Sequence, residues 1–129
     1  MGITWDKGTY VVKNRTGSTL TLGDFKAEKG RFGDRPVVSI EDGADEDPAF
    51  SAQSKNDSRD GPVGFVEYGL PDGTLMIIRF ALPDKGEIVL SATFKGARAS
   101  QYSSDVTIDK WIPKGGGRRV EGTIEAKRA

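Results

Sequence analysis

The sequence predicts an all-β protein, folded as an antiparallel β-sandwich of about nine or ten strands. Three observations support this prediction. Segments rich in Val, Ile, Thr and aromatic residues recur at intervals of roughly ten residues. Turn signals separate them, and 17 glycines and 6 prolines supply the backbone conformations that tight turns need. No segment shows the period of an amphipathic helix.

Nine segments are expected to form strands, because each is short and combines β-branched or aromatic residues with polar ones. In chain order they are 9–14, 19–28, 37–40, 49–54, 64–68, 74–82, 87–94, 102–112 and 118–126. The turn signals between them are RTGS (15–18), EDGA (41–44), LPDG (70–73), LPDKG (82–86) and KGGG (114–117).

The first connection is predicted to be the tight turn of a hairpin that joins segments 9–14 and 19–28. Thr16 and Gly17 are placed at its centre. Gly17 is expected to have a positive φ, because a connection this short needs a left-handed residue.

Two of the predicted strands differ in their alternation. Segment 118–126 places small and apolar residues on one face and polar residues on the other, as a half-buried strand does. The apolar face holds Val120, Gly122, Ile124 and Ala126, and the polar face holds Glu121, Thr123 and Glu125. Segment 74–82 is apolar on both faces, so we expect it in the interior of a sheet.

Length and composition exclude several classes of function. A chain of 129 residues fits one domain spanning residues 1–129. Its 19 basic and 19 acidic residues cancel, so no net field favours nucleic acid as a partner, although local patches stay open. Without Cys or His, thiolate catalysis, Ser-His-Asp triads and Cys or His metal sites are excluded. Carboxylate, Lys, Tyr and hydroxyl chemistry remains, so a carboxylate pair for glycoside hydrolysis stays open.

The sequence contains no apolar run long enough to cross a bilayer, and its first residues, MGITWDKG, lack the apolar segment of a secretory signal. We therefore expect a soluble chain that is cytoplasmic or released without a classical signal.

Three short motifs are open to a functional reading. Asn56, Ser58, Asp60, Gly61 and Glu67 match positions 1, 3, 5, 6 and 12 of a calcium-binding EF-hand loop. Strands rather than helices are predicted around this motif and Asn replaces the first Asp, so no metal or other cofactor is assigned. The acidic run 41–47 is interpreted as a solvated loop. Residues 14–16, Asn-Arg-Thr, match an acceptor for N-glycosylation.

A pattern that covers most of the chain resembles the aegerolysin family, both its fungal members and the related small bacterial insecticidal crystal proteins. The pattern consists of NRTGSTLTL (14–22), KGR (29–31), Pro36, FSAQS (50–54), DGPVGFVEY (60–68), IIRFALPDKG (77–86) and a final TI strand. The resemblance implies an actinoporin-like β-sandwich that binds membrane lipid and carries out no enzymatic reaction.

The resemblance also implies a site. In the family an acidic or polar residue precedes a G-x-x-G turn and helps to select a lipid headgroup, and Asp60 stands there, before Gly61 and Gly64. A carboxylate on a turn can accept hydrogen bonds from a headgroup, but capping of the turn, a common role of Asp, is the favoured interpretation. Lys29 and Lys85 stand in loops where fungal members have tryptophan. The candidate headgroup-binding residues are therefore Asp60, Lys29, Arg31, Phe32, Lys85 and Trp111, with Gly17, Gly61 and Gly64 as turn glycines. For Phe32, Trp5 and Trp111, burial in the core is the favoured interpretation and lipid contact the alternative.

The leading functional hypothesis is a lipid-recognising component of a pore-forming toxin system, insecticidal or cytolytic, that binds sphingolipid or another headgroup. A larger pore-forming protein would be its partner. The alternative is a non-lytic module that binds a protein or glycan across the surface of the sandwich. The sequence leaves the lipid, the oligomeric state and the need for a partner open.

Overall fold

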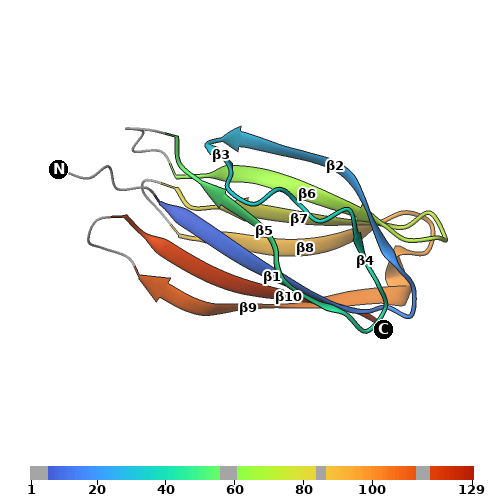
Figure 1. Ribbon diagram of the computed structural model, residues 1–129. Coiled ribbons are helices and arrows are strands. Elements are labelled where there is room, and N and C mark those ends of the chain that lie inside the picture. Colours follow the sequence, from blue (N-terminus) through green and yellow to red (C-terminus); the bar gives the residue numbers. More distant parts are fainter. Residues whose placement is uncertain (1–5, 56–60, 84–86, 113–116) are drawn as a thin grey trace.

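The computed structural model describes residues 6–55, 61–83, 87–112 and 117–129, which form two five-stranded sheets packed face to face (Figure 1). This confirms the all-β sandwich, and ten strands agree with the predicted number. The strands are β1 (Lys7–Arg15), β2 (Leu20–Lys29), β3 (Arg31–Phe32), β4 (Ser39–Ile40), β5 (Asp45–Gln53), β6 (Val63–Gly69), β7 (Leu75–Ala81), β8 (Val89–Lys95), β9 (Tyr102–Ile112) and β10 (Arg119–Arg128). A one-turn 3₁₀ helix, η1 (Ala99–Gln101), precedes β9. In the described ranges we find no helix that has both the length and the apolar character to span a membrane.

The first sheet, called sheet A, has the strand order β3-β5-β1-β10-β9. Its central pair is parallel: β1 and β10, the first and last strands of the chain, run side by side from Lys7 opposite Arg119 to Arg15 opposite Lys127. The predicted antiparallel sandwich is confirmed for the other strand pairs, and this parallel pair is an exception that the sequence did not predict. The reason is long-range, because two strands more than 100 residues apart need no tight turn to join them.

The second sheet, called sheet B, has the order β4-β2-β6-β7-β8, and all its pairs are antiparallel. Because β1 belongs to sheet A and β2 to sheet B, the predicted first hairpin is wrong. The segment between Arg15 and Leu20 crosses from one sheet to the other. Gly17 nevertheless has the expected positive φ, 87°.

The core lies between the two sheets and follows the predicted alternation. In β10 the side of Val120, Gly122, Ile124 and Ala126 is buried. β7 lies inside sheet B between β6 and β8, as predicted, with Met76, Ile78 and Phe80 buried. Its outward residues Leu75, Ile77 and Ala81 are half-buried. β7 therefore contributes one face to the core and presents the other on the outside of sheet B.

An aromatic cluster fills the middle of the core. Tyr10, Phe50 and Phe80 have ring centroids 5.0 to 5.8 Å apart. Phe32 packs edge-on against Phe25, Phe50 and Phe80 at 5.6 to 6.3 Å. Burial of such large rings is the main source of stability in a sandwich of this size.

The two ends of the sandwich are defined by the strand register. The basic end comprises the described residues at and beyond the outermost row of each sheet. These rows are Arg31, Gln53, Lys7, Arg119 and Ile112 in sheet A, and Lys29, Val63, Ala81 and Val89 in sheet B. The network end is the opposite end, with the connections 15–20, 40–45, 69–75 and 95–102.

Candidate functional site

A row of basic side chains crosses sheet A at the basic end. Cross-strand partners share a face of a sheet, and Arg31, Lys7 and Arg119 alternate with the inward residues Phe32, Gly8 and Val120. The three cations therefore project outward. Arg31 donates to the side-chain oxygen of Gln53 from Nη2 (3.0 Å) and Nε (3.2 Å) when the Gln53 amide is turned toward it.

Arg118 joins the two sheets at this end. Its Nη2 lies 2.7 Å from Oδ2 of Asp6, and its Nη1 and Nη2 donate to the carbonyls of Pro83 (2.6 Å) and Leu82 (3.2 Å). Burial alone would raise the pKa of the Asp6 carboxyl, but the hydrogen bonds and the positive charge of Arg118 outweigh it and lower that pKa below its usual value. The ion pair, 14% to 19% exposed at its side chains, fixes the start of β1 against the end of β7.

Close backbone approaches explain the glycines predicted as turn residues. A Cβ on Gly61 would collide with the Leu82 carbonyl, and one on Gly64 would collide with the Lys26 carbonyl. Gly64 lies inside β6, so its assignment to a turn is wrong. Its lack of a side chain lets β2 approach the buried face of β6 and leaves room for the Phe80 ring. Gly61 is buried and precedes β6.

Exposed apolar side chains gather on the neighbouring edge strands β8 and β9. Val89 (45% exposed), Ile108 (43%), Trp111 (38%) and Ile112 (39%) make up this group, which we call the seam patch. By register, Trp111 and Ile108 turn toward the seam between the sheets, whereas Ile112 projects from the outer face of sheet A and Val89 from the outer face of sheet B. The two edge strands contact each other, and Ser104 Oγ donates to the Ala92 carbonyl at 2.8 Å. The seam patch includes Val89 and Ile112 from the outermost rows, so it adjoins the basic end.

Trp111 and Ile108 are exposed although the register turns them inward. They face Val120 and Gly122, two buried residues of β10. Sheet B therefore leaves this corner of sheet A partly uncovered. A half-exposed indole at the end of an edge strand suits an interface between water and an apolar phase.

The predicted site residues lie at one end of the sandwich but not in one cluster. Lys29 and Arg31 stand at one corner, where β2 leads into β3, and both are exposed. Trp111 lies on β9, at the other edge of sheet A from β3, so the expected core burial is wrong for it. Phe32 is half-buried in the aromatic cluster and contributes to the core. Asp60, Lys85 and Trp5 lie outside the described residues, as do Asn56 and Ser58 of the calcium motif.

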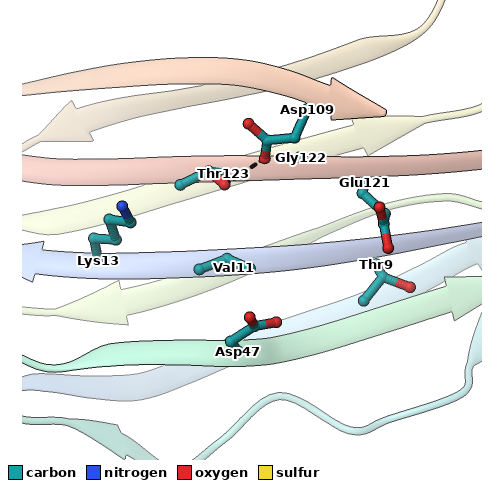
Figure 2. A pocket seen from close by; sticks show the side chains of 8 residues that line it. All are labelled: Thr9, Val11, Lys13, Asp47, Asp109, Glu121, Gly122 and Thr123. Atoms are coloured by element: carbon teal, nitrogen blue, oxygen red, sulfur yellow. Dashed lines mark hydrogen bonds between the residues drawn. The ribbon is translucent and has the colours of Figure 1, made fainter. Parts of the chain in front are cut away.

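A shallow pocket lies on the outer face of sheet A, away from these residues (Figure 2). Its volume is about 330 Å³, and it spans β5, β1, β10 and β9. Its lining residues are Thr9, Val11, Lys13, Asp47, Asp109, Glu121, Gly122 and Thr123. Sequence patterns do not indicate this pocket, because its residues come from four strands whose order in the sheet no local pattern specifies.

A β-bulge shapes the pocket. The register between β10 and β9 shifts between Glu121 and Gly122, which leaves Asp109 as the extra residue of β9. The Asp109 carboxylate accepts hydrogen bonds from Thr123 Oγ1 (2.5 Å) and Thr107 Oγ1 (3.1 Å). Figure 2 shows Asp109 and Thr123 on one side of the pocket and Asp47 on the other. Within the described residues no group of three or more acidic side chains is arranged to hold a metal ion.

The glycosylation motif has a structural role in this fold. Asn14 is fully buried, and its Nδ2 donates to the carbonyls of Ser18 (2.7 Å) and Ile40 (2.8 Å). A glycan cannot be attached to this nitrogen in the folded protein. Part of the acidic run is also structural, because Asp42 accepts from the Gly17 amide and Asp45 pairs with Arg15.

No protein-family model and no curated protein matches the sequence. Solved structures do match the fold. The lipid-binding protein Nakanori has a TM-score of 0.70 and 14% identity over 99% of this chain and 72% of its own. RahU, solved in complex with TRIS, has a TM-score of 0.64 and 13% identity over 98% of this chain and 96% of its own. IP-1A from Alcaligenes faecalis has a TM-score of 0.60 and 17% identity over 98% of this chain and 91% of its own. At such low identities these likenesses establish the fold alone, and that fold is the aegerolysin-like β-sandwich which the resemblance implied.

Proposed function

We propose that this protein recognises membrane lipid, with the seam patch and the adjoining basic end as its contact surface. The observation that supports the proposal is the gathering of Val89, Ile108, Trp111 and Ile112 on two adjacent edge strands. A concentration of exposed apolar side chains at one part of a globular domain is typical of an interaction site. The lipid-binding activity named for Nakanori, which shares the fold, agrees with this choice of partner.

The physical basis is the transfer of apolar side chains from water into the interfacial region of a bilayer. The indole of Trp111 has an apolar body and a polar N–H, which suits the level of the headgroups. Ile108, on the same side of β9, would enter beside it, and Ile112, which projects from the other side of the strand, would enter at the end of β9. No covalent step is required, so the proposal treats the protein as a binding component and not as an enzyme.

A role in a pore-forming system is the finer part of the proposal and rests on the aegerolysin resemblance. In that role the protein would mark the target membrane and a larger partner would form the pore. Dye-filled vesicles test it: the protein alone should bind them without releasing dye, and release should need the partner. Release by the protein alone would contradict the division of labour.

The test of lipid recognition is co-sedimentation with vesicles of phosphatidylcholine, of sphingomyelin with cholesterol, and of phosphatidylcholine with phosphatidylserine. Replacing Trp111 by Ala should weaken binding to the preferred vesicles by roughly tenfold, equivalent to about 1.4 kcal/mol. Val38→Ala is the matched control, because Val38 is 73% exposed but lies outside the seam patch. Equal losses for the two variants, or no binding to any vesicle, would contradict the proposal.

A second candidate function is the binding of a small hydroxylated amine, such as an amino sugar, in the pocket of sheet A. Three carboxylates and two threonine hydroxyls line that pocket, a combination that can pair with an ammonium group and hydroxyls. RahU, with the same fold, was solved in complex with TRIS, which is such an amine. Calorimetric titration with glucosamine and with glucose tests it. Glu121→Gln should abolish binding of glucosamine, whereas Glu125→Gln, on the same face of β10 but outside the lining, should not.

A further inference from the structure

The formal charges of this protein cancel over the whole chain, but the fold separates them. At the basic end six cations stand against two carboxylates, Asp6 and Glu87. The cations are Lys7, Lys29, Arg31, Lys55, Arg118 and Arg119. The rest of the described chain then has ten basic and fourteen acidic residues, since sixteen of each are described. The stretches outside the described ranges contain three of each sign and do not alter the balance.

The separation arises from register and not from local sequence. Lys7, Arg31 and Arg119 are far apart in the chain, yet they lie in one row across sheet A, with Ile112 at its end. In sheet B the outermost row begins with Lys29 and continues through the apolar residues Val63, Ala81 and Val89. Each outermost row therefore combines cations with apolar side chains of the seam patch or its neighbours.

Arg118 is neutralised within the fold. Arg118 pairs with Asp6, and this ion pair is mostly buried. Removing this pair from the count leaves the sum of formal charges over the described residues of this end at plus four, because one cation and one carboxylate cancel. Charges on neighbouring strands act together on a partner, because such strands lie about 4.8 Å apart and the Debye length at physiological ionic strength is about 8 Å.

We propose that the basic end binds an anionic membrane surface, which makes the lipid partner of the proposed function one with a net negative headgroup. The inference rests on that proposed function and narrows it. The cations would lie over the phosphates and carboxylates of the headgroups while the seam patch enters the interface. The excess negative charge elsewhere would be repelled, so the sandwich would bind by this end first.

The apolar neighbours of the cations favour a membrane over a soluble polyanion. A nucleic acid or heparin would meet the positive charge but would leave the isoleucines and the indole in water. An anionic bilayer matches both parts of the surface. The experiment must therefore also be able to detect binding to a soluble polyanion.

The experiment compares binding to vesicles of phosphatidylcholine alone and of phosphatidylcholine with phosphatidylserine, at low and at physiological salt. The wild type should prefer the anionic vesicles and lose affinity as salt rises. Each basic residue near an anionic leaflet strengthens binding by roughly fivefold. The double variant Lys29→Glu, Lys55→Glu should therefore bind at least about 25-fold more weakly.

The matched control is Lys95→Glu, Arg98→Glu, which changes the net charge of the chain equally but at the network end, where both residues are exposed. Its affinity for the anionic vesicles should lie within about threefold of that of the wild type. Thermal melts of both double variants verify that each is folded.

Several results would overturn the inference. If the wild type binds neutral and anionic vesicles equally and Trp111→Ala binds both more weakly, the preference for anionic lipid is overturned and the proposed lipid recognition stays intact. Equal losses in the two double variants would show that only net charge matters. Binding to heparin but to no vesicle would replace the membrane by a soluble polyanion, and absence of all vesicle binding would remove the proposed function as well.

Discussion

The two ends of the sandwich satisfy their polar groups in different ways. At the network end, side chains bind the connecting backbone: Asn14 accepts from Thr16 and donates to two carbonyls, and Arg128 Nε donates to the Thr16 carbonyl at 3.0 Å. At the basic end the ion pair of Asp6 with Arg118 performs the comparable task. Lys7, Lys29 and Arg119 lie on the outside of this end.

This difference assigns stability mainly to the network end and binding mainly to the basic end. Among the described residues, four of the six positive-φ glycines lie in the connections of the network end, where turns are tight and hydrogen-bonded: Gly17, Gly43, Gly73 and Gly96. The basic end instead combines exposed cations with the seam patch. Substitutions at the network end should therefore change the free energy of unfolding, and most substitutions at the basic end should change only binding.

The largest effect is expected for Asn14→Ala. The change removes four hydrogen bonds and leaves buried carbonyls and the Thr16 amide without a partner. The free energy of unfolding should fall by about 3 kcal/mol. Urea denaturation measures it, with Ser18→Ala as control, because Ser18 joins this network through its backbone. A loss below about 1 kcal/mol would mean that water replaces the amide.

Arg118→Met tests the clamp at the basic end. It removes the partner of the mostly buried Asp6 carboxylate and two hydrogen bonds to Leu82 and Pro83. We expect a loss of about 2 kcal/mol in the free energy of unfolding. Arg119→Met, at the next position but exposed, should cost under about 0.5 kcal/mol. If both variants are equally stable, the clamp contributes nothing.

Gly17→Val isolates the cost of a left-handed residue. Gly17 has a φ of 87°, and a Cβ there would have open space with Arg128 Nε 3.7 Å away, so strain of the backbone is the main penalty. The expected loss in the free energy of unfolding is about 1 kcal/mol. Gly69→Val, at a strand position where a Cβ makes ordinary contacts, is the comparison. A smaller loss for Gly17→Val than for Gly69→Val would contradict backbone strain as the cause.

Tyr10→Phe should leave stability unchanged or raise it by up to about 1 kcal/mol. The Tyr10 hydroxyl is buried beside Gly8 and makes no hydrogen bond to the described part of the chain, and burial raises the pKa of this phenol. Removing an unpaired hydroxyl removes a desolvation penalty while the ring keeps its contacts with Phe50 and Phe80. A clear loss of stability in urea would show that the hydroxyl has a partner.

The smallest effect is expected for Asp72→Asn and should depend on pH. A hydrogen bond from Tyr102, 2.6 Å long, and one from the Thr74 amide lower the pKa of Asp72 to about 2. In the unfolded chain the pKa of an Asp carboxyl is about 4, so above this pH the ionised Asp72 stabilises the folded state. This contribution to stability is lost as the pH falls toward 2. The wild type should thus exceed the variant in stability at pH 7 and match it near pH 2. A difference that persists in acid would contradict this linkage.

Local pattern was sufficient to predict every strand except the two-residue β3. The period-two alternation of 118–126 identified the buried face of β10, and segment 102–112 coincides with β9. Turn residues were equally informative at Gly17, because the demand for a positive φ is set by the connection itself. These features depend on neighbours within a few residues, and the sequence displays those neighbours directly.

The partition of strands into sheets, the parallel pairing of β1 with β10 and the location of charge were decided by tertiary structure. A cation at residue 7 meets cations at 31 and 119 only once the register is fixed, so the composition of a chain with no net charge does not indicate a basic end. The exposure of Trp111 and the burial of Asn14 have the same origin. Both depend on which strand of the opposite sheet covers them, and contacts between distant segments determine that cover.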